Sequence, residues 1–237
     1  MIGWLRRGFR RNTWWSRLLY AGLYPVVGVL YMIINKAAVN FDRHYVWKWA
    51  IDDWIPFNKY FVIAYYYWYV QIVVSIAWLV FSRRTGRLLH RMVLAINLSM
   101  IISSLFFLFL PTTIDRPAII GDGPLELLLR QLFAVDNPYN LFPSIHVAYS
   151  VVMARYWTLA GPRRLWFHLV NYGGTVMVLL STVFIKQHYA PDIFGGIAVA
   201  VIACLLSDLL FRVCLYRLLP ETVGTGSQPA PTQPANP

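Results

Sequence analysis

The sequence has little charge of either sign and is poorest in acidic residues. Of its 237 residues, 13% are charged, and only 10 are Asp or Glu against 21 Lys or Arg. A soluble domain usually carries about 25% charged residues, so this composition argues against a soluble fold. Cysteine is also scarce. Cys204 and Cys214 fall ten residues apart on different faces of one predicted helix, which excludes a disulfide between them.

Apolar residues are abundant, at 58% of the chain, and they gather in long runs. Six runs come close to the ~20 residues that cross ~30 Å of hydrocarbon. They lie near residues 16–35, 60–81, 91–110, 144–160, 166–185 and 193–215. The sequence therefore predicts an all-α, polytopic membrane protein, with six transmembrane helices in one domain over residues 1–219. The last 17 residues hold four prolines and no aromatic residue, so residues 220–237 are predicted to be a disordered cytoplasmic tail.

The basic residues indicate the topology. If the N-terminus is cytoplasmic, fourteen Lys and Arg fall on the cytoplasmic side and seven on the other, as expected from their bias toward cytoplasmic loops. Both termini are then cytoplasmic, and the loops around Arg116, Asn140 and His188 face outward. The net charge of +11 is thus explained by basic residues that set the membrane orientation, and no nucleic-acid partner is expected. The small size, with one sequon inside a span, favours a bacterial plasma membrane.

Two outer segments are predicted to be short interfacial helices. In residues 44–57, Trp residues recur at helical spacing, and Lys48 and Asp52 would share another face. In residues 124–133, Pro124 suits the first turn, four leucines form a stripe, and Glu126 would pair with Arg130. These helices could gate a site from the lipid side, or simply anchor the chain at the interface, which is the simpler interpretation.

An aromatic run, YYYWY, occupies residues 65–69 inside the second predicted span. These rings could stack on a lipid or a sugar, but packing against neighbouring helices is the simpler expectation.

Most polar groups at the outer ends of the spans lie in three stretches, residues 111–117, 137–146 and 181–192. Ionisable groups at membrane depth are costly, so each stretch is a candidate functional site. A single Arg or Lys there could snorkel to the interface, and a single His could be a hydrogen-bonded core residue. Because all three stretches emerge on one side, they indicate a shared site.

The residue types suit an anion and nucleophilic chemistry. Pro143 is predicted to begin the fourth span, which would leave the N–H groups after it free to bind an anion. Arg116 carries a planar cation suited to phosphate oxygens. Asp192, four residues after His188, can orient the His188 ring and leave Nε2 as a nucleophile. His146 can donate a proton to a leaving oxygen. These groups form a phosphoryl-transfer site that uses no metal and no cofactor.

These residues resemble the three signature motifs of the type 2 phosphatidic acid phosphatase superfamily, which read K-x6-R-P, P-S-G-H and S-R-x5-H-x3-D. The matching positions here are Arg116-Pro117, Pro143-Ser144-Ile145-His146, and Ser181 with His188 and Asp192. The resemblance implies that His188 attacks phosphorus with support from Asp192, while His146 protonates the leaving alcohol and then activates water. It also implies that Arg116, Ser144 and Ser181 hold the phosphate.

Three positions depart from the family pattern, and they resemble the branch that contains inositol phosphorylceramide synthases. Phe109 stands where the first motif has Lys, Ile145 where the second has Gly, and Thr182 where the third has Arg. The chain thus lacks two cations of the family. Lys186 would share a helix face with Thr182, so we expect it to replace the missing guanidinium at the phosphate.

The first functional hypothesis is an integral-membrane lipid phosphatase that hydrolyses a lipid phosphomonoester or pyrophosphate on the extracytoplasmic face, through a phosphohistidine. The second is a phospholipid head-group phosphotransferase of the phosphorylceramide synthase type, in which an alcohol replaces water. The third is a non-catalytic lipid-binding or transport protein. All three have membrane lipids as partners, and the first two a lipid phosphate substrate. The oligomeric state stays open.

Overall fold

The computed structural model describes residues 22–82 and 86–215. In these two ranges the chain is helical, with two isolated β-bridges and no strand. The helices are α3 (Leu23–Ala38), α4 (Ile51–Trp54), η1 (Lys59–Phe61), α5 (Val62–Phe81), α6 (Gly86–Phe109), α7 (Pro124–Val135), α8 (Ile145–Ala160), α9 (Leu165–Phe184), α10 (Ala190–Leu210) and η2 (Phe211–Leu215). The predicted all-α class is confirmed for this part of the chain. The start of the first predicted span and the predicted tail lie outside the described residues.

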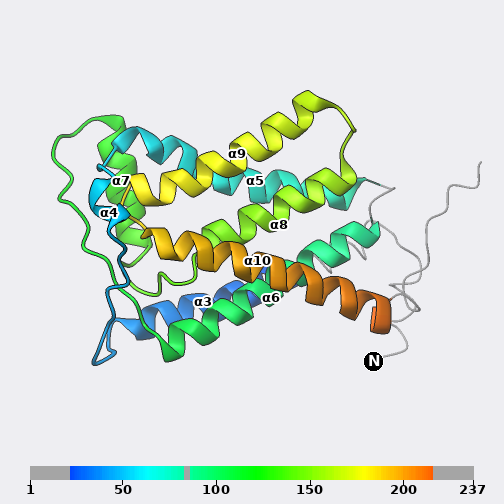
Figure 1. Cartoon of the computed structure of the whole chain (residues 1–237), viewed down its shortest axis with the longest axis horizontal. Coiled ribbons are helices and arrows are strands. Elements are labelled where there is room, and N and C mark those ends of the chain that lie inside the picture. Colours follow the sequence, from blue (N-terminus) through cyan, green and yellow to red (C-terminus); the bar gives the residue numbers. More distant parts are fainter. Residues whose placement is uncertain (1–21, 83–85, 216–237) are drawn as a thin grey trace, which may run out of the picture.

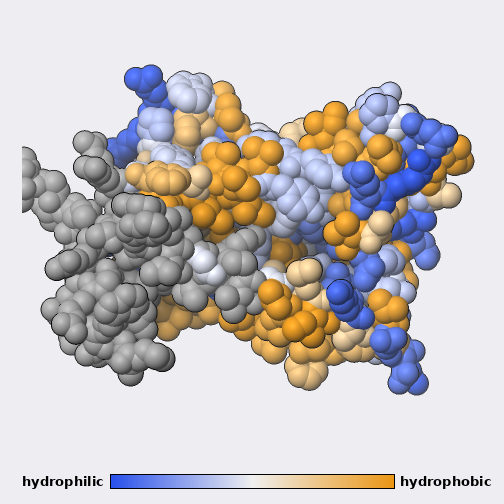
Figure 2. All heavy atoms as spheres, turned by 180° about the vertical axis from the view of Figure 1, so that it is seen from behind, coloured by the Kyte–Doolittle hydropathy of each residue, from blue (hydrophilic) through white to orange (hydrophobic). Residues whose placement is uncertain are grey.

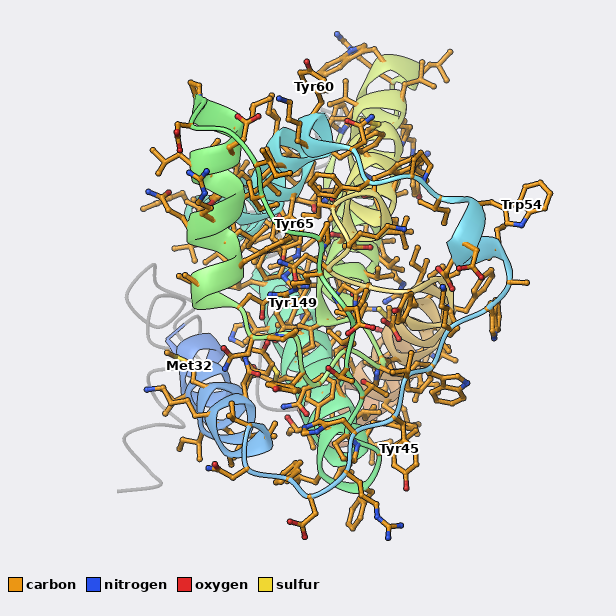
Figure 3. The ribbon with its side chains drawn as sticks, turned by 90° about the vertical axis from the view of Figure 1, so that its left-hand side faces the viewer. Met32, Tyr45, Trp54, Tyr60, Tyr65 and Tyr149 are labelled. Carbon is orange, nitrogen blue, oxygen red and sulfur yellow. The ribbon has the colours of Figure 1, made fainter. Side chains whose placement is uncertain are left out.

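The long helices run along one axis of the molecule (Figure 1), and α4 and α7 lie at the same end of it, on opposite sides (Figure 3). Helix α8 is central, since it contacts α5, α6, α9 and α10. Most of its side chains are buried, and they pack with residues of α5, α6 and α10 in one hydrophobic core. The N-terminal end of this central helix points toward the end of the bundle that carries α7.

Four helical segments are long and apolar enough to cross a membrane: Lys59–Phe81, Arg87–Phe109, Leu165–Phe184 and Ala190–Val213. Helices α3 and α8 have 16 residues each, which corresponds to about 24 Å, less than the ~30 Å of hydrocarbon. The structure therefore supports four of the six predicted spans by length and composition.

The bundle carries large apolar side chains on its outside. Val73 on α5, Leu169 on α9 and Leu205 on α10 are each more than 60% exposed. Figure 2 shows apolar residues over the middle of one face, with hydrophilic residues at its right-hand end, which is the α7 end of Figure 1, and at its upper left. Such a surface is stable against lipid chains rather than water. We conclude that this is a membrane protein.

The predicted interfacial helix over residues 44–57 is wrong for most of its length. Only Ile51–Trp54 is helical, and Lys48 pairs with Asp53 rather than sharing a face with Asp52. The Asp52 carboxylate is buried and accepts hydrogen bonds from the N–H groups of Trp49, at 2.9 Å, and Ala190, at 2.7 Å. This tertiary contact to the start of α10 outweighs the helical spacing of the tryptophans, and Trp54 projects outward at the rim (Figure 3).

The helix predicted over residues 124–133 is confirmed as α7, with Pro124 in its first turn. Its leucines pack inward, because Leu129 and Leu132 join a buried cluster that includes residues of α5. The predicted pair of Glu126 with Arg130 is wrong. Glu126 forms an ion pair with Lys59, which faces it from η1, and Arg130 instead reaches Asp122 and the carbonyl of Gly121.

An ion cluster ties three helices together at the other end of the bundle. Asp208 on α10 accepts from Arg91 of α6, through Nε at 2.9 Å and Nη2 at 2.5 Å, and from Arg155 of α8 at 2.6 Å. Ser207, the preceding residue, donates to the carbonyl of Arg91 at 2.7 Å. The three charges are mostly shielded from solvent, so each guanidinium depends on the same carboxylate for its counter-charge.

Replacing Asp208 with Asn should therefore destabilise the protein. Loss of charge-assisted hydrogen bonds in a shielded site costs about 1.5–3 kcal/mol each, which for a chain of this size lowers Tm by several degrees. Thermal unfolding in detergent measures this. The matched control is Asp53→Asn, because Asp53 is 64% exposed in its pair with Lys48. Equal Tm values for the two variants would show that the cluster adds no stability.

Candidate active site

His188 is placed by the way in which α9 ends. Lys186 has a left-handed backbone, with φ of 56°, and the N–H groups of Lys186 and Gln187 bind the carbonyls of Val183, at 3.2 Å, and Thr182, at 2.9 Å. This is the Schellman arrangement that closes a helix C-terminus. The N–H of His188 joins it with a 3.0 Å bond to the Thr182 carbonyl. Helix geometry thus fixes the backbone of His188.

Because α9 ends at Phe184, the predicted helix face shared by Thr182 and Lys186 is wrong. The Lys186 ammonium instead donates to main-chain carbonyls of the α4 segment, those of Ile55 at 2.6 Å and Asp52 at 3.4 Å. It therefore links the end of α9 to the segment that caps α10.

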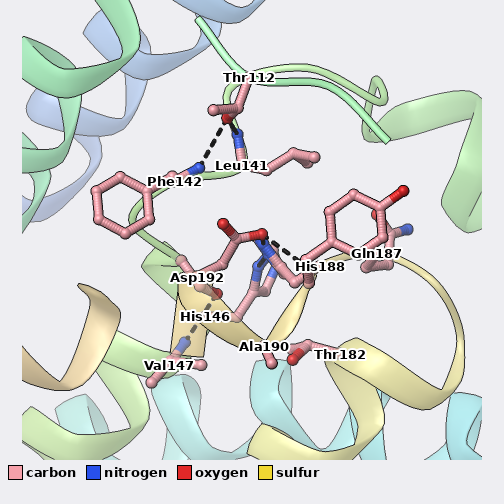
Figure 4. A network of polar contacts seen from close by, with 12 residues as sticks. Thr112, Leu141, Phe142, His146, Val147, Thr182, Gln187, His188, Ala190 and Asp192 are labelled. Atoms are coloured by element: carbon pink, nitrogen blue, oxygen red, sulfur yellow. Dashed lines mark hydrogen bonds and ion pairs between the residues drawn. The ribbon is translucent and has the colours of Figure 1, made fainter. Parts of the chain in front are cut away.

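Asp192 holds the His188 ring. Its Oδ2 lies 3.2 Å from His188 Nδ1 and also accepts from the N–H of Tyr189 at 3.0 Å (Figure 4). Tyr189 is the N-cap of α10, and His188 precedes it on the entry turn, as the sequence predicted from Pro191. A carboxylate that accepts from Nδ1–H leaves Nε2 of the imidazole with its lone pair.

His146 is brought to the same place by the start of α8. The prediction that Pro143 is the first helical residue is wrong by two positions, because α8 begins at Ile145 and Ser144 is its N-cap. The Ser144 N–H is not free, since it donates to the carbonyl of Asp192 at 3.1 Å. This bond joins the first turns of α8 and α10. Among the residues that the structure describes, no acceptor lies within bonding distance of the N–H groups of Ile145 and His146.

The two histidines meet directly. His146 Nδ1 lies 3.4 Å from His188 Nε2, and both side chains are buried. With Nδ1–H of His188 turned to Asp192, the bond between the rings requires a proton on Nδ1 of His146. A single phosphorus centre can therefore be reached by both rings once it displaces this contact. This is the spacing that a nucleophile and a general acid need.

Arg116 belongs to the same cluster but is already anchored. Its Nη1 donates to the carbonyl of Asp136 at 2.5 Å, and its Nη2 to that of Asn137 at 3.3 Å and to the side-chain oxygen of Gln187. Its guanidinium also lies 4.7 Å from the ring of Phe133. Burial lowers the pKa of Arg116, an effect that the nearby Asp136 opposes. The cation is held beside the histidines, with Nε left buried and without a partner.

Two amides that the sequence reasoning missed also face this place. Asn140 is 4% exposed, neither atom of its amide has a partner, and it lines a small cavity with His146 and His188. Its backbone is left-handed, with φ of 59°, a conformation that Asn tolerates better than most residues. The Gln187 amide nitrogen is also buried without a partner. Buried unpaired donors beside a nucleophile suit the oxygens of an anion.

The two serines of the motifs make contacts within their own helices. Ser144 Oγ accepts from the N–H of Val147 at 3.4 Å, and Ser181 Oγ donates to the carbonyl of Val178 at 2.6 Å. Both are fully buried. Their predicted role in holding phosphate stays a prediction.

A larger cavity opens next to the histidines. It has a volume of about 490 Å³ and is lined by residues of α3, α5, α6, α7 and α8, with His146 at its wall and apolar side chains such as Met32 and Met100. Within residues 22–82 and 86–215, no three His, Cys, Asp or Glu side chains group as a metal site.

The sequence matches a known protein family. A model of the PAP2 superfamily, that of the type 2 phosphatidic acid phosphatases, matches residues 36–206, well over half of the chain. No curated protein matches the sequence. Among solved structures, a crystal structure of Aquifex aeolicus LpxE is similar, with a TM-score of 0.46 and 19% identity, over 76% of this chain and 93% of that one.

The free amide of Asn140 leads to a prediction about anion binding. Asn140→Asp keeps the size and the left-handed backbone but places a negative charge beside the histidines, so we expect vanadate to inhibit at least tenfold more weakly, a change of about 1.4 kcal/mol. Inhibition curves for purified protein measure this. Asn58→Asp is the control, because Asn58 caps η1 by accepting from Tyr60 N–H, which Asp can also do. Unchanged vanadate inhibition of Asn140→Asp would contradict a role in the cradle.

Proposed function

The chain belongs to the PAP2 superfamily, and from that membership we propose that it is an integral-membrane lipid phosphatase. Its substrate would be a lipid phosphomonoester or pyrophosphate, and the reaction would pass through a phosphohistidine at His188. The prediction of a PAP2-type phosphatase is confirmed at the level of the family. The observation that carries the finer proposal is the series of contacts from Asp192 to His188, at 3.2 Å, and from His188 to His146, at 3.4 Å.

The proposed reaction has two halves. His188 Nε2 attacks phosphorus in line with the ester oxygen, which leaves as an alcohol with the proton from His146 Nδ1. Water then attacks the phosphohistidine, with His146 as the base, and inorganic phosphate departs. Asp192 stabilises the positive charge that develops on the His188 ring. The buried donors near the site, from Arg116, Asn140 and Gln187, would hold the equatorial oxygens, a form of charge stabilisation worth ~3–4 kcal/mol per donor in other enzymes.

The neighbouring cavity supports a lipid as the substrate. Its wall is largely apolar and reaches His146 from the side of α3 and α7, so an acyl or prenyl chain could lie there while its phosphate enters the polar cluster. We further propose that α3 and α8 complete a six-span topology, with both termini cytoplasmic and the histidines on the extracytoplasmic side of a bacterial plasma membrane.

This function is tested by phosphate release from lipid phosphates in detergent micelles. We expect the wild type to release phosphate, and His188→Ala to lose at least 10⁴-fold in kcat, since no other group can form the intermediate. His168→Ala is the control. His168 lies near the start of α9, where its ring contacts Phe167 and Tyr172.

Residual turnover above one hundredth of wild type in His188→Ala would contradict the phosphohistidine route. Addition of ceramide or diacylglycerol should leave phosphate release unchanged. A fall in release matched by transfer of phosphate to the added alcohol would contradict hydrolysis.

Lys186 gives a separate test. We propose that its ammonium replaces, at the phosphate, the guanidinium that the third motif lacks here, so Lys186→Ala should reduce kcat by about 10²–10³. Its present contacts are to the carbonyls of Ile55 and Asp52, so Tm should be measured beside kcat. A lowered Tm with near-normal kcat would show that Lys186 only anchors the α4 segment and would refute its role at the phosphate.

A further inference from the structure

The second ring nitrogen of His146 has a partner that none of the family motifs contains. His146 Nε2 lies 2.5 Å from the hydroxyl of Tyr65, and the Tyr65 side chain on α5 is completely buried. Figure 3 shows Tyr65 at the centre of the helix bundle, away from the rim where Trp54 and Tyr60 project. The Tyr65 hydroxyl also lies 3.3 Å from Oδ2 of Asp136. His146 is therefore linked on one side to the nucleophile and on the other to a phenol and a carboxyl group.

Asp136 is held in an unusual way for a carboxylate. Its Oδ1 accepts from the hydroxyl of Tyr31 on α3 at 3.3 Å, so phenols contact both of its oxygens. Arg116 is close but binds the main-chain oxygen of Asp136. When Asp136 carries a proton on Oδ2, that oxygen donates to the Tyr65 hydroxyl, and the Tyr65 proton is then free to be donated to Nε2 of His146.

We propose that Asp136 and Tyr65 form a proton relay that exchanges a proton with Nε2 of His146 while Nδ1 of the same ring serves the reacting oxygen. This inference rests on the proposed phosphatase function. It makes Tyr65 and Asp136 positioning residues that act through His146.

The relay explains how a buried, neutral His146 can act as an acid. As His188 Nε2 bonds to phosphorus and the bond from phosphorus to the ester oxygen breaks, that oxygen keeps the electron pair and takes the Nδ1 proton of His146. In the same step, Nε2 takes the proton of the Tyr65 hydroxyl, and Tyr65 takes one from the Asp136 carboxyl group. His146 ends neutral, with its proton on Nε2, and Asp136 ends as a carboxylate near Arg116.

The second half reverses each transfer. The free lone pair on Nδ1 of His146 accepts a proton from the water that attacks phosphorus, and the bond between phosphorus and His188 breaks with its electrons returning to Nε2. The proton on Nε2 of His146 passes back to Tyr65, and that of Tyr65 to Asp136. Every proton is restored, and the two tautomers of His146 are the ones that the two halves need.

The surroundings of Asp136 give the sign of the pH dependence. The groups that face it are Tyr31 from α3, Tyr65 and Tyr69 from α5, Arg116 from the loop before α7, and His188. Burial raises the pKa of Asp136, while Arg116, His188 and the hydrogen bonds with Tyr31 and Tyr65 oppose the shift. The first half requires the protonated carboxyl group, so turnover should fall as pH rises through the pKa of Asp136, and this limb should be absent in Asp136→Asn.

The test compares two leaving groups in the full-length protein in detergent. Tyr65→Phe keeps the ring and removes the relay. For a long-chain alkyl phosphate, whose leaving oxygen needs a proton, we expect kcat to fall about 10²–10³-fold. For a 4-nitrophenyl phosphate, whose leaving group departs as an anion, the initial burst of nitrophenolate should change less than threefold. The control is Tyr66→Phe, which removes a hydroxyl that donates to the Leu128 carbonyl at 3.3 Å and should change neither rate more than twofold.

The outcomes separate the relay from the proposed function. A wild type without phosphate release, or an active His188→Ala, would overturn the function itself. An active wild type whose Tyr65→Phe variant either keeps normal alkyl phosphate turnover or loses both rates equally would overturn the relay alone. If Tyr65→Phe does not fold, Asp136→Asn replaces it, because the amide keeps the shape and an acceptor but cannot pass the proton. The same split between the two leaving groups is then required.

Discussion

One carboxylate oxygen holds the site together. Oδ2 of Asp192 accepts from Nδ1 of His188 and from the N–H of Tyr189, and so fixes a side chain and the backbone beside it with one atom. The carbonyl of Asp192 accepts in turn from Ser144, which caps the helix that carries His146. The positions of both histidines therefore depend on the first turn of α10, and the separation between their rings follows from these short connections rather than from the bundle as a whole.

Contacts from other parts of the fold hold the first turn of α10 in place and shield it from solvent. The left-handed Lys186 closes α9 so that His188 is held by the Thr182 carbonyl. Asp52, from a segment more than a hundred residues away, caps the N–H of Ala190. Helix α7 covers the start of α5 with Leu129 and Leu132. In this shielded place hydrogen bonds are strong, and an unpaired polar group is costly. The unpaired amide nitrogens of Asn140 and Gln187 are for that reason the clearest indication that an anion binds there.

The sequence could predict the helices and the motif residues, because both depend on local patterns. Apolar runs placed α5, α6, α9 and α10, and the spacing of His188 and Asp192 predicted their contact. The helix predicted over residues 44–57 is wrong for most of its length. The tryptophans have helical spacing, but the Asp52 carboxylate accepts a hydrogen bond from the distant N–H group of Ala190. The predicted pair of Glu126 with Arg130 is wrong for a similar reason, because Lys59 of η1 forms the ion pair with Glu126. The roles of Tyr65, Asp136, Asn140 and Gln187 could not be found from a single sequence, since only tertiary contacts between distant segments bring them to the histidines.

The proposed mechanism depends on transfer of the phosphoryl group to the imidazole of His188. Purified protein should be mixed with a ³²P-labelled lipid phosphate, quenched in alkali within milliseconds, digested and mapped by mass spectrometry. The account predicts an acid-labile, alkali-stable phosphate on Nε2 of His188 that appears before free phosphate and decays at the rate of turnover. Label on any other side chain, or phosphate release with no labelled enzyme at any time, would contradict it.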